Sequence, residues 1–162
     1  MKYILYTTKA TQNGIEFYQT TLTYGEIDTL SVVTGDSKAD RILPHDTQYK
    51  LRDKSVREIS QHLSHGSFCS ALTFSLVPNS LKPLVLGADY TLEDSDIPKI
   101  ERLTINVGFF LLAVDGRHRI AGIRKLLEEN PEFADQKAPV VLIPFSSASD
   151  TERLFSDLSK SK

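Results

Sequence analysis

The sequence predicts an α+β fold in which helices pack on a mixed β-sheet that begins with an N-terminal β segment. Three observations predict this class. The first 34 residues are rich in β-branched and aromatic residues, two runs at 109–114 and 138–145 are apolar at nearly every position, and amphipathic helical patterns lie around those runs. The chain has 162 residues, 40% of them hydrophobic, which suits one domain over residues 1–162.

The N-terminal segment has the pattern of a β-hairpin. Residues 2–8 and 15–24 carry strand-forming side chains, and Asn13 with Gly14 supplies a tight turn between them. Residues 27–33, "IDTLSVV", have a similar composition and are a candidate third strand.

A long loop and a helix come next. Residues 34–51 are polar and show no sustained period, which predicts a loop of the kind that is often functional or mobile. Residues 55–66 predict a helix, because Ser55 and Glu58 have the spacing of a capping box and an apolar face recurs at helical spacing. Gly66 stands where that helix should stop.

Strands dominate the middle of the chain. Residues 68–78 alternate large and small side chains as a strand does, whereas residues 79–98 predict a connection with at most one short strand. Residues 101–114 resume strand character, and their apolar second half predicts a strand that is buried on both faces at the centre of the sheet. The run at 138–145 predicts one more buried strand.

Two helices complete the predicted fold. Residues 117–129 form an amphipathic pattern that ends before Pro131, because proline cannot continue a helix. Residues 149–162 predict a second helix, with Ser149 and Glu152 in capping-box spacing.

Composition excludes several classes of protein. The formal net charge of −2 lacks the basic excess of a protein that coats nucleic acid, so any phosphate binding must be local. The single cysteine, Cys69, cannot form an internal disulfide, which agrees with a reducing compartment. The N-terminal apolar patch is too short for a signal peptide and no segment approaches a membrane span, so we expect a cytoplasmic protein with no membrane partner.

The most informative stretch is the strand-to-helix corner Asp115, Gly116, Arg117, His118 and Arg119. Glycine lets the backbone turn in a conformation that other residues avoid, and the first N–H groups of a helix have no intrahelical acceptors. Two arginines and a histidine beside those groups would add charge-assisted donors. We therefore expect these five residues to bind phosphate, from a nucleotide or from a nucleic-acid backbone.

Helical geometry separates the roles of these residues. At 100° per residue the buried stripe of the helix contains Ile120, Ile123, Leu126 and Leu127. Arg119 lies on the border of that stripe and should be partly buried, while His118, Gly122 and Lys125 lie on the opposite side. A purely structural alternative remains, in which Asp115 caps the helix or pairs with Arg119 and His118 is solvated.

The segment "VDGRHRIAGI" resembles the Asp-Gly-Gln-His-Arg signature of the DGQHR-domain family, which includes the DndB proteins of DNA sulfur modification. The similarity covers roughly residues 50–162, and "ERLFSDLSKSK" is similar to the family's Phe-x-Asp-hydrophobic-Asn segment. Two residues depart from the pattern: Arg117 replaces the usual glutamine, and Ser159 stands where asparagine is common. Family members are usually longer, so the chain is either an N-terminal domain or a short member.

The resemblance implies a ParB/sulfiredoxin-like core, in which Gly116, His118 and Arg119 meet phosphate. It implies a DNA-binding regulator of phosphorothioation, acting near the modification genes of bacteria, with DNA and other DNA sulfur modification proteins as partners. Sulfiredoxin chemistry needs a cysteine where this chain has Arg117, so that thiol reaction is unavailable.

The residues of the corner also fit other functions. The same corner could serve a ParB-like switch that binds or hydrolyses a nucleotide triphosphate with Mg, placed by Asp115 or Asp94, and a nuclease is a weaker alternative. No pair of carboxylates has a convincing catalytic spacing, so catalytic residues are unknown and enzymatic activity stays uncertain.

A metal site is disfavoured. His62, His65 and Cys69 could supply three ligands, and His45 and Asp46 are the only further candidates nearby. Those two residues lie in the predicted loop, and the sequence does not define their position relative to the first three.

Overall fold

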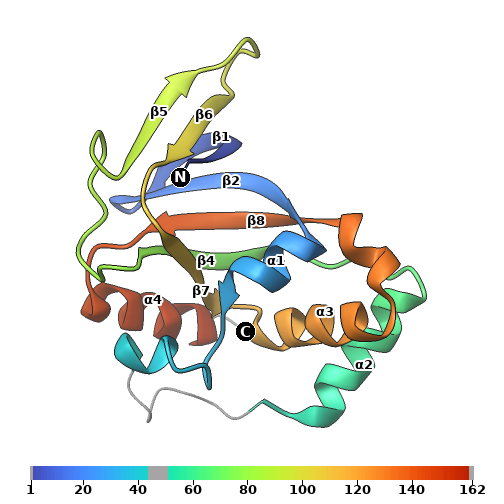
Figure 1. Ribbon diagram of the computed structural model, residues 1–162. Helices are drawn as coiled ribbons and strands as arrows, with labels where there is room; N and C mark the ends of the chain where they lie inside the picture. Colours follow the sequence, from blue (N-terminus) through green and yellow to red (C-terminus); the bar gives the residue numbers. More distant parts are fainter. Residues whose placement is uncertain (1, 44–50, 161–162) are drawn as a thin grey trace.

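The computed structural model describes residues 2–43 and 51–160, and their architecture is an α+β fold with a mixed eight-stranded sheet, as the sequence predicts (Figure 1). The strands are β1 (Tyr3–Gln12), β2 (Ile15–Thr23), β3 (Ser31–Val32), β4 (Leu72–Pro78), β5 (Tyr90–Asp94), β6 (Glu101–Ile105), β7 (Phe109–Asp115) and β8 (Lys137–Pro144). The helices are α1 (Tyr24–Leu30), α2 (Asp53–Ser64), α3 (Arg117–Glu129) and α4 (Ala148–Lys160), with 3-10 turns η1 (Ala39–Arg41) and η3 (Pro131–Asp135).

The sheet has the strand order β3-β7-β4-β8-β2-β1-β6-β5. The β3–β7 and β4–β8 pairs are parallel and the other pairs are antiparallel, which makes the sheet mixed. The N-terminal hairpin is confirmed, with Gln12 opposite Ile15 and both Asn13 and Gly14 at positive φ. Through β2 this hairpin pairs with β8, so the N-terminal β segment belongs to the same sheet as the corner.

Helices cover both faces of the β7 end of the sheet. Helices α1 and α3 pack on one face with α2 against α3, whereas η1 and α4 pack on the other (Figure 1). Strand β7 is buried between these layers: Leu111 and Ala113 point to the α3 side, and Phe110, Leu112 and Val114 point to the α4 side. The prediction of a strand buried on both faces is therefore confirmed.

The position and length of that strand differ from the prediction. Residues 101–114 form two strands, because the chain leaves the sheet after β6, which pairs with β1, and re-enters as β7, which pairs with β4. Strand β7 is interior but not central, since only the two-residue β3 lies beyond it. Similarly, the strand expected over 68–78 begins at Leu72, and Phe68 is 83% exposed.

The candidate strand at 27–33 is wrong over most of its length, because α1 occupies Tyr24–Leu30. A capping box starts this helix: the Glu26 N–H donates to Thr23 Oγ1 at 3.0 Å, and the Thr23 N–H donates to Glu26 Oε1 at 2.9 Å. This Thr-x-x-Glu signal was present in the sequence, and it outweighed the β-branched composition that follows.

The two capping boxes predicted elsewhere are absent from the described helices. Helix α2 starts at Asp53 with no side-chain hydrogen bond at its N-cap, Arg52. At the start of α4 the acceptor is Ser147, whose Oγ receives the Asp150 N–H at 3.0 Å. In both cases the helix begins before the serine that was expected to cap it.

Helix α3 spans residues 117–129 as predicted, but the side opposite its buried stripe is not open. Gly122 is buried against α2, and a Cβ placed on it would lie 2.5 Å from Ile59 Cγ2. The missing side chain therefore allows α2 and α3 to approach closely.

The predicted loop after β3 is described only in its first part. The described part of the predicted loop, residues 34–43, contains the short turn η1, and residues 44–50 lie outside the described residues. Within the described part of the chain, no helix is both long and apolar enough to cross a membrane.

Candidate functional site

The corner between β7 and α3 depends on Gly116. This residue is the N-cap of α3 and has φ +84°, a left-handed conformation that side chains disfavour. A Cβ there would lie 2.6 Å from Leu72 Cδ2 and 2.9 Å from the Arg119 guanidinium. Glycine is therefore required both by the backbone conformation and by the space available.

The N-cap residue of α3 makes no side-chain cap. The N-cap glycine cannot supply one, and the first intrahelical bond of the helix runs from the Ile120 N–H to the Gly116 carbonyl at 2.9 Å. Asp115 Oδ2 lies 3.7 Å from Arg119 Nη2, the ion pair that the structural alternative allowed. The positive end of the helix dipole thus lies beside two arginine side chains.

Arg119 has the partly buried position that the helical geometry predicts, with 22% of its side chain exposed. Its guanidinium donates to the Ala71 carbonyl at 2.9 Å and to the Ser70 hydroxyl, both just before β4. The ion pair with Asp115 is the longer contact, so the hydrogen bonds to the segment before β4 dominate. Arg119 therefore connects α3 to the neighbouring strand.

Arg117 reaches in another direction. Its guanidinium donates to Thr34 Oγ1 at 3.0 Å, in the segment that follows β3. The hydroxyl is a neutral acceptor, so the positive charge of Arg117 is not cancelled by that contact.

His118 is not simply solvated. Its Nε2 accepts the backbone N–H of Arg52 at 3.2 Å, and Arg52 is the N-cap of α2. An accepting Nε2 carries no proton, so the proton of the neutral ring is on Nδ1. His118 therefore joins the start of α3 to the start of α2.

These five residues lie together in one pocket of about 360 Å³, which we call the corner pocket. It is lined by residues 113–119 together with Phe155 and Ser159 of α4. Ser159, whose Oγ donates to the Phe155 carbonyl at 2.9 Å, is the position noted above as a departure from the resemblance. The two sequence segments that carry the family resemblance thus meet in space, although about 40 residues separate them.

Sequence reasoning missed the residues that hold the corner in place, namely Thr34, Arg52, Ser70 and Ala71. They belong to three separate segments and have no motif of their own. Of the predicted site residues, all five from Asp115 to Arg119 are brought together, whereas Asp94 lies on β5 at the far edge of the sheet from β7. Asp94 therefore cannot place a metal for a ligand in this pocket.

The residues described by the structure contain no group of three or more His, Cys, Asp or Glu side chains that could hold a metal ion, and His45 and Asp46 lie outside those residues. Cys69 is buried, as expected, and burial raises the pKa of its thiol, although the nearby Arg119 charge acts in the opposite direction. The thiol is therefore protonated and unreactive at neutral pH.

The fold and the corner together define a class: a mixed-sheet α+β protein that presents arginines and a helix N-terminus in one pocket. The chain belongs to the DndB family, described as DNA-sulfur modification-associated, whose family profile matches residues 5–162. The match includes both residues 50–162, where the similarity was noted, and the N-terminal hairpin. No curated protein and no solved structure matches the chain.

Proposed function

We propose that the chain is a DNA-binding regulator of DNA phosphorothioation and that the corner pocket contacts backbone phosphate. Family membership supports the link to DNA sulfur modification. The observation that carries the DNA-binding part is the gathering of Arg117, Arg119 and the first turn of α3 in one pocket. A phosphate there would accept charge-assisted hydrogen bonds and would interact favourably with the helix dipole.

The two arginines would contribute differently. The guanidinium of Arg119 is engaged by Ser70, Ala71 and Asp115, so its main role is to hold the corner in shape. Arg117 lies in the first turn of α3 on the wall of the pocket, and its guanidinium donates to the neutral Thr34 hydroxyl. Arg117 is therefore the side chain whose removal should change phosphate affinity most directly.

A duplex-DNA titration at two salt concentrations tests this proposal. Each Lys or Arg that neutralises a phosphate adds about one unit to the salt slope of DNA affinity. We expect Arg117→Gln, which restores the usual family residue, to weaken binding and to lower that slope by about one.

The matched control is Arg102→Gln, which removes the same charge from β6, far from the corner in the strand order. It should leave the slope unchanged, because its guanidinium pairs with Glu93 on the exposed β5–β6 hairpin. An equal loss in both variants would mean that DNA responds to overall charge, and no loss in either would remove the corner from the DNA-binding surface.

A nucleotide is the competing ligand for the same pocket, whose volume of about 360 Å³ is in the range of small-molecule sites. A ParB-like switch would also need an acidic residue for Mg, and Asp115 is the one acidic side chain among the described residues that line the pocket. Titration with ATP and Mg beside the DNA titration separates the two ligands. Tight ATP binding without DNA binding would replace the proposal.

A further inference from the structure

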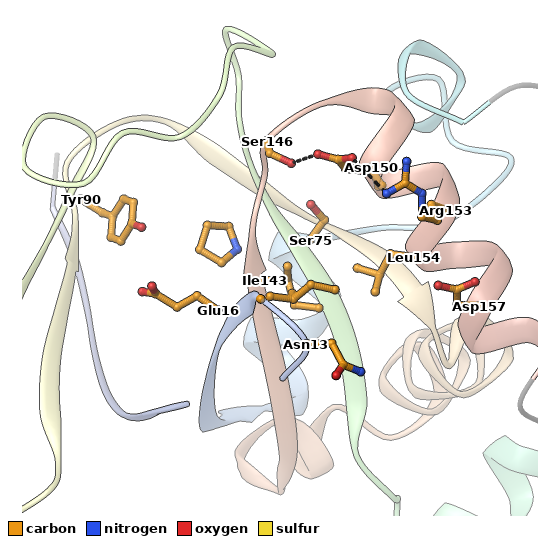
Figure 2. A pocket seen from close by; sticks show the side chains of 14 residues that line it. Asn13, Glu16, Ser75, Tyr90, Ile143, Ser146, Asp150, Arg153, Leu154 and Asp157 are labelled. Atoms are coloured by element: carbon orange, nitrogen blue, oxygen red, sulfur yellow. Dashed lines mark hydrogen bonds and ion pairs between the residues drawn. The ribbon is translucent and has the colours of Figure 1, made fainter. Parts of the chain in front are cut away.

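A second pocket, of about 430 Å³, lies away from the corner, and we call it the acidic pocket (Figure 2). It is formed between the turn of the β1–β2 hairpin, the end of β8, Tyr90 of β5 and one face of α4. None of the residues from Asp115 to Arg119 lines it, so it is separate from the proposed phosphate site.

Carboxylates dominate the charge of this pocket. Glu16, Asp150 and Asp157 line it, against the single guanidinium of Arg153. Arg153 Nη1 lies 3.8 Å from Asp150 Oδ1 on the same helix. The positive charge of Arg153 therefore neutralises only one of the three carboxylates. Because the Ser146 hydroxyl donates to Asp150 at 2.7 Å, the pKa of that carboxyl lies below its usual value and the group stays ionised at neutral pH. An anionic ligand is disfavoured here and a cation is favoured.

The carboxylates lie at opposite sides of the pocket. In Figure 2, Glu16 is on the hairpin side and Asp157 is on α4, with the apolar side chains of Ile143 and Leu154 between them. A ligand that matches this arrangement has positive charge at its ends and methylene groups in its middle.

Ser75 provides an independent observation that points to a ligand. This β4 residue is only 2% exposed, and its side chain lines the pocket (Figure 2). No hydrogen bond joins its hydroxyl to another described residue. The small exposed part of this side chain faces the pocket, so an N–H donor bound there can be accepted by its hydroxyl.

Tyr90 offers a second acceptor. Its side chain is 5% exposed and projects into the pocket from the opposite side to α4 (Figure 2). Burial raises the pKa of the Tyr90 phenol, so the group stays neutral and its oxygen can accept a hydrogen bond.

We propose that the acidic pocket binds a linear aliphatic diamine or polyamine, with one ammonium group at Glu16, another at Asp157, and the hydroxyls of Ser75 and Tyr90 as further acceptors. The methylene chain between the ammonium groups lies against Ile143 and Leu154. This site is additional to the proposed contact with DNA phosphate and uses a different set of residues.

Calorimetric titration of the full chain with spermidine at about 150 mM salt, where exposed charges are screened, tests the proposal. We expect saturable binding at one site, and no binding of hexane-1,6-diol, which has a similar methylene body without charge. Asp157→Asn should weaken the affinity for spermidine by about tenfold, because it removes one charge-assisted contact. Asp157 forms no ion pair with another described residue, so the fold should tolerate this change.

Two further variants make the result specific. Glu16→Gln should also weaken binding by about tenfold, and its amide oxygen can still accept the Tyr18 hydroxyl, which Glu16 accepts in the parent. Asp94→Asn is the control, since it removes the same charge from an exposed position on β5 outside the pocket. Its affinity for spermidine should equal that of the parent.

Several results would overturn the proposal. They are the absence of saturable spermidine binding, equal losses in Asp94→Asn and Asp157→Asn, and binding of the diol as strong as that of spermidine. Binding of inorganic phosphate in this pocket, lost in Ser75→Ala, would assign it to an anion instead.

Discussion

The two pockets share helix α4 but differ in charge and in how their walls are held together. Residues Asp150, Arg153, Leu154 and Asp157 recur at helical spacing and give one face of α4 to the acidic pocket, while Phe155 and Ser159 give the adjacent face to the corner pocket. The corner pocket is cationic, and hydrogen bonds to three other segments connect its side chains to the rest of the fold.

The walls of the acidic pocket are less connected. Among the described residues, no hydrogen bond or ion pair joins Asn13 or Glu16 of the hairpin to α4. The difference suggests two kinds of site: a corner whose shape is built into the fold, and a pocket whose acceptors remain available for a ligand. Substitutions in the two pockets should therefore separate effects on stability from effects on binding.

The largest effect is expected from Gly116→Ala in the corner pocket. The new Cβ must adopt φ +84° and must displace Leu72 and Arg119, so we expect a loss of about 3 kcal/mol in the free energy of unfolding. Urea denaturation measures it. Gly87→Ala is the control, because Gly87 also has positive φ but open space around it, and should lose only about 1 kcal/mol. Equal losses would mean that the contacts with Leu72 and Arg119 do not matter.

A smaller loss is expected from Arg119→Ala. It removes the hydrogen bonds to Ser70 and Ala71 from a side chain that is mostly buried, so the free energy of unfolding should fall by about 2 kcal/mol. Arg119→Lys keeps the charge but not the planar set of donors, and should fall between the parent and the alanine variant. A thermal melt of Arg119→Ala that coincides with the parent would contradict the structural role of this arginine.

For Arg117→Gln we expect a change in stability within about 0.5 kcal/mol, because the residue lies in the first turn of α3 outside the buried stripe, and glutamine can also donate to the Thr34 hydroxyl. The same variant should lower the salt slope of DNA binding, so stability and affinity would separate between neighbouring arginines. Urea denaturation beside the DNA titration checks both. A loss of stability as large as that of Arg119→Ala would show that the two arginines share one structural role.

The smallest effect on stability should come from Ser75→Ala in the acidic pocket. Since no described residue bonds the Ser75 hydroxyl, its removal should leave the free energy of unfolding unchanged or raise it by up to about 0.5 kcal/mol. Affinity for spermidine should nevertheless fall. A marked loss of stability would mean that the hydroxyl has a structural role and would weaken the contrast between the two pockets.

Several features of the fold could be predicted because their signals are local. The apolar run of β7, the glycine that follows it and the amphipathic pattern up to Pro131 define α3 at residues 117–129, as the structure has it. The border position of Arg119 also follows from helical geometry alone. A prediction was wrong where two local signals disagree. At residues 27–33 the side chains favour a strand, but the capping box just before them starts a helix.

By itself, the sequence determined the α+β class, the hairpin at Asn13 and Gly14, the corner and its family resemblance. Tertiary structure alone decided the partners of the corner and the existence of the acidic pocket. Thr34, Ser70 and Ser159 reach the corner from distant segments, and the acidic pocket is formed by the hairpin, β4, β5, β8 and α4. The reason is physical: the strand order brings together residues far apart in the chain, and neither composition nor periodicity specifies that order.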